Sequence, residues 1–196
     1  MGACRDVPLL IFNTEESQMI YEHHRRTTRL KDYDYSSDGA YFMTLCTHNR
    51  ECIFGHIIDG EMHLNEYGKI VCDEWHNFPN RYLSIGLDAI VVMPNHIHAI
   101  IVIHDVGAIH ELPLRNDVTH RRRMLIPTII GYVKMKTAKR INQCRNTPGI
   151  HVWQRNYHEH VIRDEADLCR VREYINNNPF QWNMDSENLK NIGTRR

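Results

Sequence analysis

The chain has 196 residues, 42% of them hydrophobic and 24% charged, which indicates a globular protein of one ordinary domain and excludes a disordered or fibrous one. An apolar run such as Ala99–Ile103 is far too short to cross a bilayer, and the N-terminus carries no signal-peptide pattern. A soluble, cytoplasmic protein without membrane contact is therefore expected. The six cysteines form no C-x-x-C pair, which argues against a disulfide framework or a zinc knuckle.

The formal net charge of zero conceals a basic segment. Between Arg115 and Arg163 there are eleven lysines and arginines against two acidic residues, whereas the remainder of the chain is acidic by the same margin. A local surplus of positive charge on a neutral protein indicates a confined site for a polyanion.

The N-terminal half predicts an arm, three strands and a helix. Residues 1–39 are polar and predict an irregular arm, and Ala40–Thr47 predicts a strand because aromatic and branched side chains dominate it. Two short strands are expected on either side of Asp59-Gly60, a dipeptide typical of hairpin turns. From Glu66 to Phe78 the apolar residues recur at helical spacing.

The strongest strand pattern covers Leu83–Met93 and His96–Ile103, which are apolar on both faces and separated by the turn residues Pro94-Asn95. Two such strands with a tight connection indicate the centre of an antiparallel sheet. Pro127–Gln143 predicts a second helix with proline in its first turn.

The last third of the chain predicts a strand and a third helix. Residues 151–163 are expected to form a loop that runs into a short strand, and Asp164 is a good N-cap for a helix that ends before Pro179. The order of these elements predicts an α+β fold in which helices pack on one face of an antiparallel sheet.

Two histidines and a tyrosine are the best candidates for chemistry. His96 and His98 are two apart on a strand, so their side chains point to the same face. The third helix carries an apolar stripe suited to cover that face, and Tyr174 and Asn178, four apart, border the stripe. A phenol, a carboxamide and two imidazoles can then converge.

Such a set suits phosphodiester chemistry. Imidazoles together with a neutral oxygen ligand can hold a divalent cation that grips a phosphate. A free tyrosine is a poor nucleophile because its phenol titrates near pH 10. Beside a cation that polarises the phosphate it can attack and form a covalent phosphotyrosine.

Three blocks of the chain resemble one known family. The segment from Val91 to Ile103, VVMPNHIHAIIVI, resembles the histidine–hydrophobic–histidine (HUH) motif of the single-tyrosine transposases. Two more segments are similar to the REP-associated tyrosine transposase branch of that family: residues 152–182, VWQRNYHEHVIRDEADLCRVREYINNNPFQW, and residues 25–55, RRTTRLKDYDYSSDGAYFMTLCTHNRECIFG. The similarity covers Arg25 to Trp182, and agreement of three separate blocks is specific.

The resemblance implies a ferredoxin-like α+β domain over residues 40–182, between the arm and a C-terminal tail over 183–196. It implies nicking and rejoining of single-stranded DNA, often near a hairpin, with Mg²⁺ or Mn²⁺. By position, His96, His98 and Asn178 would be metal ligands and Tyr174 the nucleophile that forms a 5′-phosphotyrosine. Relatives act as monomers or as homodimers, and the sequence does not choose between the two states.

Simpler interpretations stand beside these. The histidine pair can be structural, Asn178 can merely cap a helix, and the fold can serve a non-catalytic nucleic-acid-binding module. Tyr132 and Tyr157 also lie near basic residues, and His158 and His160 repeat the spacing of the first histidine pair. Seven basic residues are the candidate DNA-binding set, with a solvated surface as the alternative: Arg121, Arg122, Arg123, Lys134, Lys136, Lys139 and Arg140.

Overall fold

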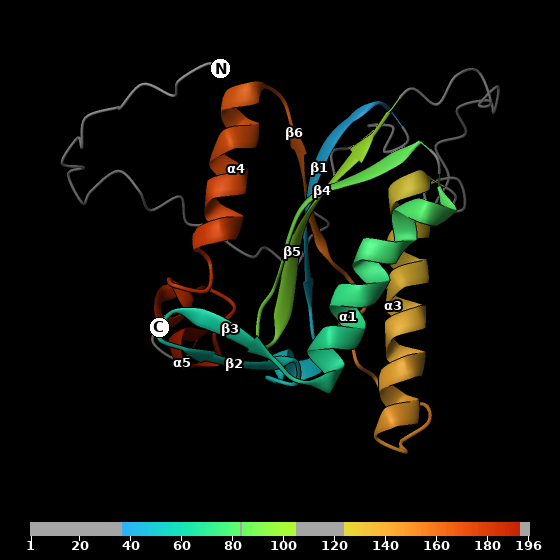
Figure 1. Ribbon diagram of the computed structural model, residues 1–196, viewed down its shortest axis with the longest axis vertical. Helices are drawn as coiled ribbons and strands as arrows, with labels where there is room; N and C mark the ends of the chain where they lie inside the picture. Colours follow the sequence, from blue (N-terminus) through green and yellow to red (C-terminus); the bar gives the residue numbers. More distant parts are fainter. Residues whose placement is uncertain (1–36, 83, 105–123, 193–196) are drawn as a thin grey trace, which may run out of the picture.

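A computed structural model describes residues 37–82, 84–104 and 124–192, drawn in colour in Figure 1. Most of the predicted arm over residues 1–39 lies outside this part of the chain, as do Arg121, Arg122 and Arg123. None of the helices in the described ranges has the length and apolarity needed to cross a membrane.

The main sheet has four antiparallel strands in the order β4-β5-β1-β6. These strands are β1 (Gly39–Cys46), β4 (Ile85–Val92), β5 (His96–Ile103) and β6 (His158–Ile162). The turn at Pro94-Asn95 joins β4 to β5, closed by a hydrogen bond from the Met93 N–H to the His96 carbonyl. The start of β5 thus lies at one end of the sheet, beside the end of β1.

A separate hairpin consists of β2 (Gly55–Ile58) and β3 (Glu61–Leu64). Its turn residues Asp59 and Gly60 both have positive φ, 51° and 80°. Two central residues with positive φ define a type I′ turn, whose twist matches that of the flanking strands. The predicted hairpin is confirmed.

Helices cover both faces of the main sheet (Figure 1). On one face, α1 (Glu66–Asn77) and α3 (Leu125–Cys144) bury the side chains of alternate β1 residues such as Met43. On the other face, α4 (Glu165–Asn177) packs on Phe42 and Ile100. The predicted α+β fold with an antiparallel sheet is confirmed, with its helices on two faces instead of one. The physical reason is that the central strands are apolar on both faces, and each face needs a cover.

The α4 helix begins and ends where its sequence predicts. The Asp164 side chain accepts a hydrogen bond of 2.8 Å from the Asp167 N–H, which satisfies one of the free donors of the first turn. The helix ends at its C-cap Asn178, directly before Pro179. Its apolar stripe faces the sheet through Leu168, Val171 and Ile175.

The chain continues after α4 as a compact turn structure. It contains the short 3-10 helix η3 (Trp182–Met184) and α5 (Leu189–Ile192), and two more 3-10 turns lie earlier, η1 (His48–Arg50) and η2 (Phe78–Arg81). Asp185 and Glu187 in this segment are buried although both are acidic. Such residues are seldom buried without partners, so this segment belongs to the packed part of the protein.

Candidate functional site

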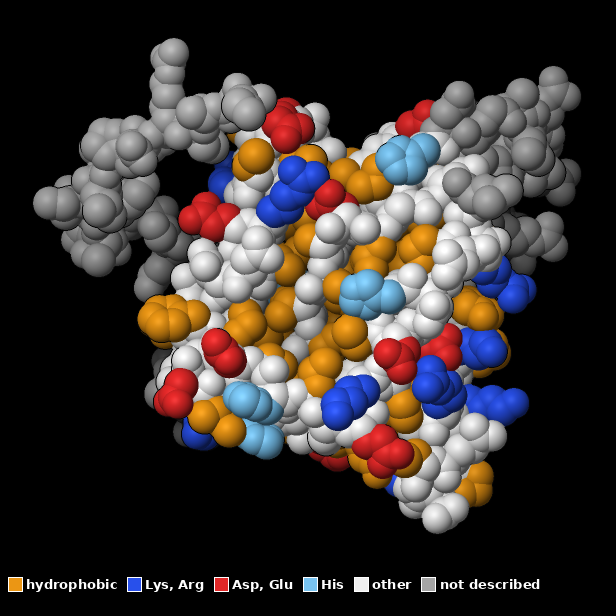
Figure 2. Space-filling view, in the orientation of Figure 1, with side chains coloured by type: hydrophobic (Ala, Val, Ile, Leu, Met, Phe, Trp, Pro, Cys, Tyr) orange, Lys and Arg blue, Asp and Glu red, His pale blue; other side chains and the backbone are white. Residues whose placement is uncertain are grey.

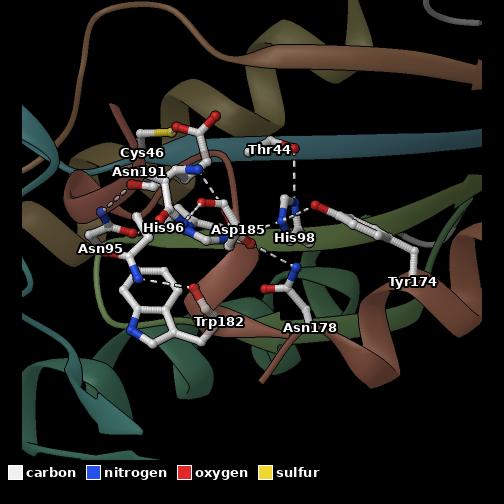
Figure 3. Close-up of polar contacts among 12 residues, drawn as sticks. Thr44, Cys46, Asn95, His96, His98, Tyr174, Asn178, Trp182, Asp185 and Asn191 are labelled. Carbon is white, nitrogen blue, oxygen red and sulfur yellow. Dashed lines mark hydrogen bonds and ion pairs between the residues drawn. The ribbon is translucent and has the colours of Figure 1, made fainter. Parts of the chain in front are cut away.

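The site begins with the two histidines at the start of β5. His96 and His98 point to the α4 side of the sheet, together with Ile100, because alternate strand residues share a face. Both imidazoles are buried, and their Nε2 atoms lie 3.0 Å apart. Figure 3 shows the two rings beside each other between α4 and the turn that carries Asp185.

A polar partner holds the other nitrogen of each ring. His96 Nδ1 lies 2.9 Å from Asn95 Oδ1, and His98 Nδ1 lies 2.9 Å from Thr44 Oγ1 on β1. The Asn95 oxygen can only accept, so the His96 Nδ1 donates and its Nε2 keeps a free lone pair. This partnering of the second nitrogen is the arrangement found around metal-binding histidines.

Burial sets the charge of the pair. It lowers the pKa of His96 to about 4, against the opposing influence of the Glu187 carboxylate. Burial, followed by the neighbouring His96, also holds the pKa of His98 well below its ordinary value. Both imidazoles are therefore neutral near pH 7, the form in which histidine binds metal ions.

Asp185 and Asn178 complete the cluster. The Asp185 carboxylate is buried, with Oδ2 3.8 Å from His96 Nε2, and it accepts a 2.9 Å hydrogen bond from Asn178 Nδ2. The His96, His98 and Asp185 donor atoms all lie within 4.8 Å of one another. Among the described residues Asn178 Oδ1 finds no hydrogen-bond partner, although it is buried.

Tyr174 stands at the solvent side of this cluster. Its hydroxyl lies 3.2 Å from His98 Nε2, and 41% of the residue is exposed (Figure 3). The Phe42 ring supports the arrangement, since it stacks on His98 at 5.3 Å and meets the Tyr174 ring edge-on at 6.0 Å. The phenol is thus fixed with its oxygen at the histidines and with a path to solvent.

The segment after α4 is anchored by Glu187. Its carboxylate pairs with Arg50 at 2.9 Å and accepts a hydrogen bond from the Cys46 thiol at 3.1 Å. Burial and this carboxylate raise the pKa of Cys46, so the thiol stays protonated as a donor. The Asn95 side chain donates 2.8 Å to the Glu187 carbonyl, which ties the segment to the turn before His96.

The cluster has the properties of a cation site. Two neutral imidazole nitrogens, a carboxylate and an amide oxygen are donors that first-row and alkaline-earth divalent ions accept. Two ligand atoms at right angles, each about 2.1 Å from one ion, are about 3.0 Å apart, and the His96 and His98 Nε2 atoms have that spacing. The buried Asn178 Oδ1, otherwise without a partner in the described structure, is an acceptor that a cation would satisfy. This buried group could bind a metal ion.

Comparison with known proteins gives two curated relatives from Haemophilus influenzae, strain Rd, while no family model matches the chain. One is an uncharacterized protein, 42% identical over 166 residues that cover 83% of this chain and 92% of the relative. The other is provisionally named a REP-associated tyrosine transposase, and is 26% identical over 149 residues that cover 76% of this chain and 74% of the relative. The chain is related to the REP-associated tyrosine transposases.

Two solved structures are also similar to this chain. One is a REP-associated tyrosine transposase bound to a REP hairpin, with 18% identity, a TM-score of 0.49, and coverage of 80% of this chain and 74% of the other. The second is a protein from Deinococcus radiodurans provisionally described as a transposase, with 17% identity, a TM-score of 0.42, and coverage of 76% and 97%.

Four of the seven basic residues predicted to contact DNA lie on α3, on the opposite face of the sheet from Tyr174, and the other three lie outside the described residues. Lys134 Nζ donates to the backbone carbonyls of Gln154 and Asn156 at 2.9 and 3.0 Å, and Arg140 pairs with Glu74 at 2.9 Å. Lys136 lies over the Tyr132 ring at 5.9 Å, and Lys139 is exposed. Lys134 and Arg140 thus hold parts of this chain together.

The second histidine pair is divided between two environments. His158 lies opposite Thr44 in the β1–β6 register, and its ring lies 6.5 Å from the Phe42 ring. It therefore borders the candidate site. His160 instead contacts Asp167 at 2.9 Å. Trp153, earlier on the same segment, is buried in the core and donates a 2.9 Å hydrogen bond to Thr137 Oγ1.

Sequence reasoning missed three residues of the site: Asn95, Asp185 and Glu187. Asn95 lies within the block that resembles the HUH motif, directly before His96, so its position was a usable signal. Asp185 and Glu187 follow Pro179 in a segment without helical or strand periodicity, and the prediction assigned them to a tail. No sequence pattern in this chain marks these two residues.

Proposed function

We propose that the chain nicks and rejoins single-stranded DNA through a covalent bond between Tyr174 and a 5′-phosphate. The observation that carries the proposal is the Tyr174 hydroxyl, 3.2 Å from His98 in a buried His-His-Asp group. Relationship to proteins named as transposases supports the same class of reaction.

In the proposed reaction the Tyr174 oxygen attacks the phosphorus of a phosphodiester. A bond forms between that oxygen and phosphorus, and the bond from phosphorus to the 3′-oxygen breaks. In the overall reaction the phenolic proton passes to the 3′-oxygen. Attack by a different 3′-hydroxyl reverses these steps and rejoins the strand. One phosphodiester is exchanged for another, so the reaction requires no external energy source.

His96, His98, Asn178 and Asp185 would hold a divalent cation, which we infer to be Mg²⁺ or Mn²⁺. When bound, such an ion would supply positive charge to the phosphate oxygens. The chain's own residues do the rest: Phe42 and α4 hold the phenol in place, and burial keeps both histidines neutral. Asn178 donates to Asp185 through Nδ2, so its Oδ1 is the atom left for a cation.

The proposed substrate is a single strand with a neighbouring hairpin. One solved structure similar to this chain is of a transposase bound to a REP hairpin, and the exposed Tyr174 leaves room for a strand to approach. Contacts from Lys136 and Lys139 on α3 to DNA remain part of the proposal, as do contacts from Arg121, Arg122 and Arg123.

The proposal is tested with Mn²⁺ and labelled single-stranded hairpin DNA. The wild type is expected to give a protein–DNA band that survives denaturation, and Tyr174→Phe should give neither cleavage nor band. Tyr132→Phe is the matched control, since it removes a hydroxyl on the opposite side of the sheet, and it should behave as the wild type.

Other outcomes identify the rival functions. Cleavage that persists in Tyr174→Phe would mean that water is the nucleophile, as in a metal-dependent phosphodiesterase. DNA binding without any cleavage by the wild type would mean a non-catalytic nucleic-acid-binding module. Either result would end the tyrosine mechanism.

A further inference from the structure

Large apolar side chains are unusually exposed around the end of α4. The described structure exposes seven such residues, and five of them lie on the segment from α4 to α5 or on the β2–β3 hairpin: Ile58, Tyr174, Phe180, Met184 and Leu189. Phe180 is 81% exposed and Met184 is 78% exposed, the highest values of the seven. Large apolar side chains carry a cost when exposed to water, and a group of them indicates a binding surface.

The same turn carries the candidate site on its inner side. Asn178 and Asp185 belong to the cluster, and the Trp182 ring lies 6.0 Å from the His96 ring. Phe180 lies two residues after Asn178, so their Cα atoms are at most about 7 Å apart. The turn therefore presents one set of side chains to the histidines and another set to solvent, close to the place where a strand would be cut.

Backbone hydrogen bonds and the hairpin hold the turn that exposes Phe180. The turn is closed by hydrogen bonds from the Gln181 N–H to the Asn177 carbonyl at 3.1 Å and from the Trp182 N–H to the Pro179 carbonyl at 3.3 Å. Phe180 also rests against the hairpin, because a Cβ atom at Gly60 would lie only 3.5 Å from its Cα. Figure 1 shows the hairpin reaching to this part of the chain.

The surface is neutral and rich in amides. No charged side chain occurs from Tyr174 to Met184, so no carboxylate in this stretch repels a phosphate backbone. Four exposed carboxamides accompany the exposed rings: Asn176, Asn177, Gln181 and Asn183. Amide groups match the hydrogen-bonding edges of bases, and aromatic rings stack on the faces of any base.

We propose that Phe180, flanked by Met184, is a stacking platform for an unpaired base next to the phosphate that Tyr174 attacks. This inference rests on the proposed function, and it adds the place where the strand beside the cut is held. A platform of this kind binds without sequence preference, because every base has a π-face.

The test measures binding by fluorescence anisotropy in the Tyr174→Phe background, so that no cleavage enters the result. The probe is a labelled hairpin with unpaired flanking bases, and Phe180→Ala is expected to weaken its binding by about 5- to 150-fold, the effect of one stacked base. Phe180→Trp should restore binding, and the slope of affinity against salt should not change, because no phosphate contact is lost. Met135→Ala, a truncation of a 59% exposed side chain on α3, is the control and should leave binding unchanged.

Two results would overturn the platform: equal binding by Phe180→Ala and its parent, or equal weakening by Phe180→Ala and Met135→Ala. A blunt hairpin without flanking bases should bind Phe180→Ala and its parent alike, and a difference there would also count against stacking. Failure of the proposed function is read separately, from the absence of a covalent adduct with Tyr174 intact. A platform without an adduct would indicate a binding module, and an adduct without a platform would leave the chemistry in place.

Discussion

Replacement of Asn95 tests how the candidate site is built. Its Oδ1 accepts from His96 Nδ1 at 2.9 Å, and its Nδ2 donates to the carbonyls of Glu187 at 2.8 Å and Arg50 at 3.1 Å. Asn95→Ala leaves the buried His96 donor and the Glu187 carbonyl without this partner. At about 1–3 kcal/mol for each of these two groups, we expect a loss of about 2–6 kcal/mol of folding free energy.

A loss of that size is measurable by thermal or urea denaturation with a chelator present. For a chain of this length each kcal/mol lowers the melting temperature by about 2–4 °C, so a shift of about 4–24 °C is expected. Nitrogen-15 NMR of the histidine rings gives a second result that a merely structural role would not affect. In the wild type the His96 proton should be on Nδ1, and in Asn95→Ala this preference should be lost.

Two variants separate the roles of Asn95. Asn95→Asp keeps an acceptor for His96 but loses the donor, so it should keep the Nδ1 proton while losing stability. Asn142→Ala removes another buried asparagine, which bonds to the Ile150 carbonyl on the other side of the sheet, and should lose stability without altering the His96 tautomer. A change of less than 0.5 kcal/mol in Asn95→Ala, roughly the scatter of surface substitutions, together with an unchanged tautomer would refute the reasoning.

Mn²⁺ at a hundredfold excess over its dissociation constant should stabilise the wild type by about 2.7 kcal/mol. Asp185→Asn should bind Mn²⁺ more weakly in calorimetric titration and should therefore lose most of this stabilisation. Unchanged binding would remove Asp185 from the site. Gly68→Ala should destabilise the protein, because its Cβ would lie 2.2 Å from the Phe54 carbonyl oxygen. In Gly131→Ala on α3 the new Cβ meets nothing within 4 Å, so this variant should stabilise the protein by about 1 kcal/mol. Denaturation curves with equal midpoints for the two variants would contradict this. Burial acts to raise the pKa of Asp167, but hydrogen bonds from His160, Arg170 and the Arg163 N–H outweigh it and lower the pKa. The stability that Asp167 adds should therefore be complete above about pH 4 and should disappear as the pH falls through the lowered pKa. The urea midpoints of Asp167→Asn and the wild type should then converge in acid. A constant difference between them would be inconsistent with that linkage.

The period-two pattern of β5 was enough to predict which face holds the histidines. Because Ile100 shares that face with His96 and His98, the sequence also predicted that α4 covers it, and the Ile175 contact agrees. The geometry of the convergence therefore followed from local periodicity and from one amphipathic helix. The roles of these residues stay proposals, and the division into arm, domain and tail over 1–39, 40–182 and 183–196 stays a prediction.

Contacts between distant segments were beyond sequence reasoning. Asp185 reaches His96 only because Glu187 binds Arg50 and Cys46, and no local pattern encodes that docking. The sequence predicts DNA contact or solvent exposure for Arg140, yet the packing of α1 against α3 gives it Glu74 as a partner. Lys134 likewise reaches the loop before β6 instead of solvent. These partners depend on tertiary structure alone.

The space-filling view adds a feature that periodicity does not predict, a hollow beside the edge strand β4 (Figure 2). It has a volume of about 570 Å³ and is lined by apolar side chains such as Leu87 and Ile90 together with polar ones such as His76 and Asn176. A bidentate ion pair between Arg172 and Asp88 borders it, at 2.6 and 2.9 Å. That pair fixes the α4 helix to the sheet on the side away from Tyr174.

The most direct measurement of the central claim uses DNA in which sulfur replaces the 3′-oxygen at the cut phosphate. A 3′-thiol leaves readily and rejoins poorly, so the covalent product accumulates with Mn²⁺ and can be digested and sequenced by mass spectrometry. The account predicts one modified peptide with the 5′-phosphate on Tyr174. Cut DNA with no modified peptide, or a nucleotide attached to any other residue, would contradict it.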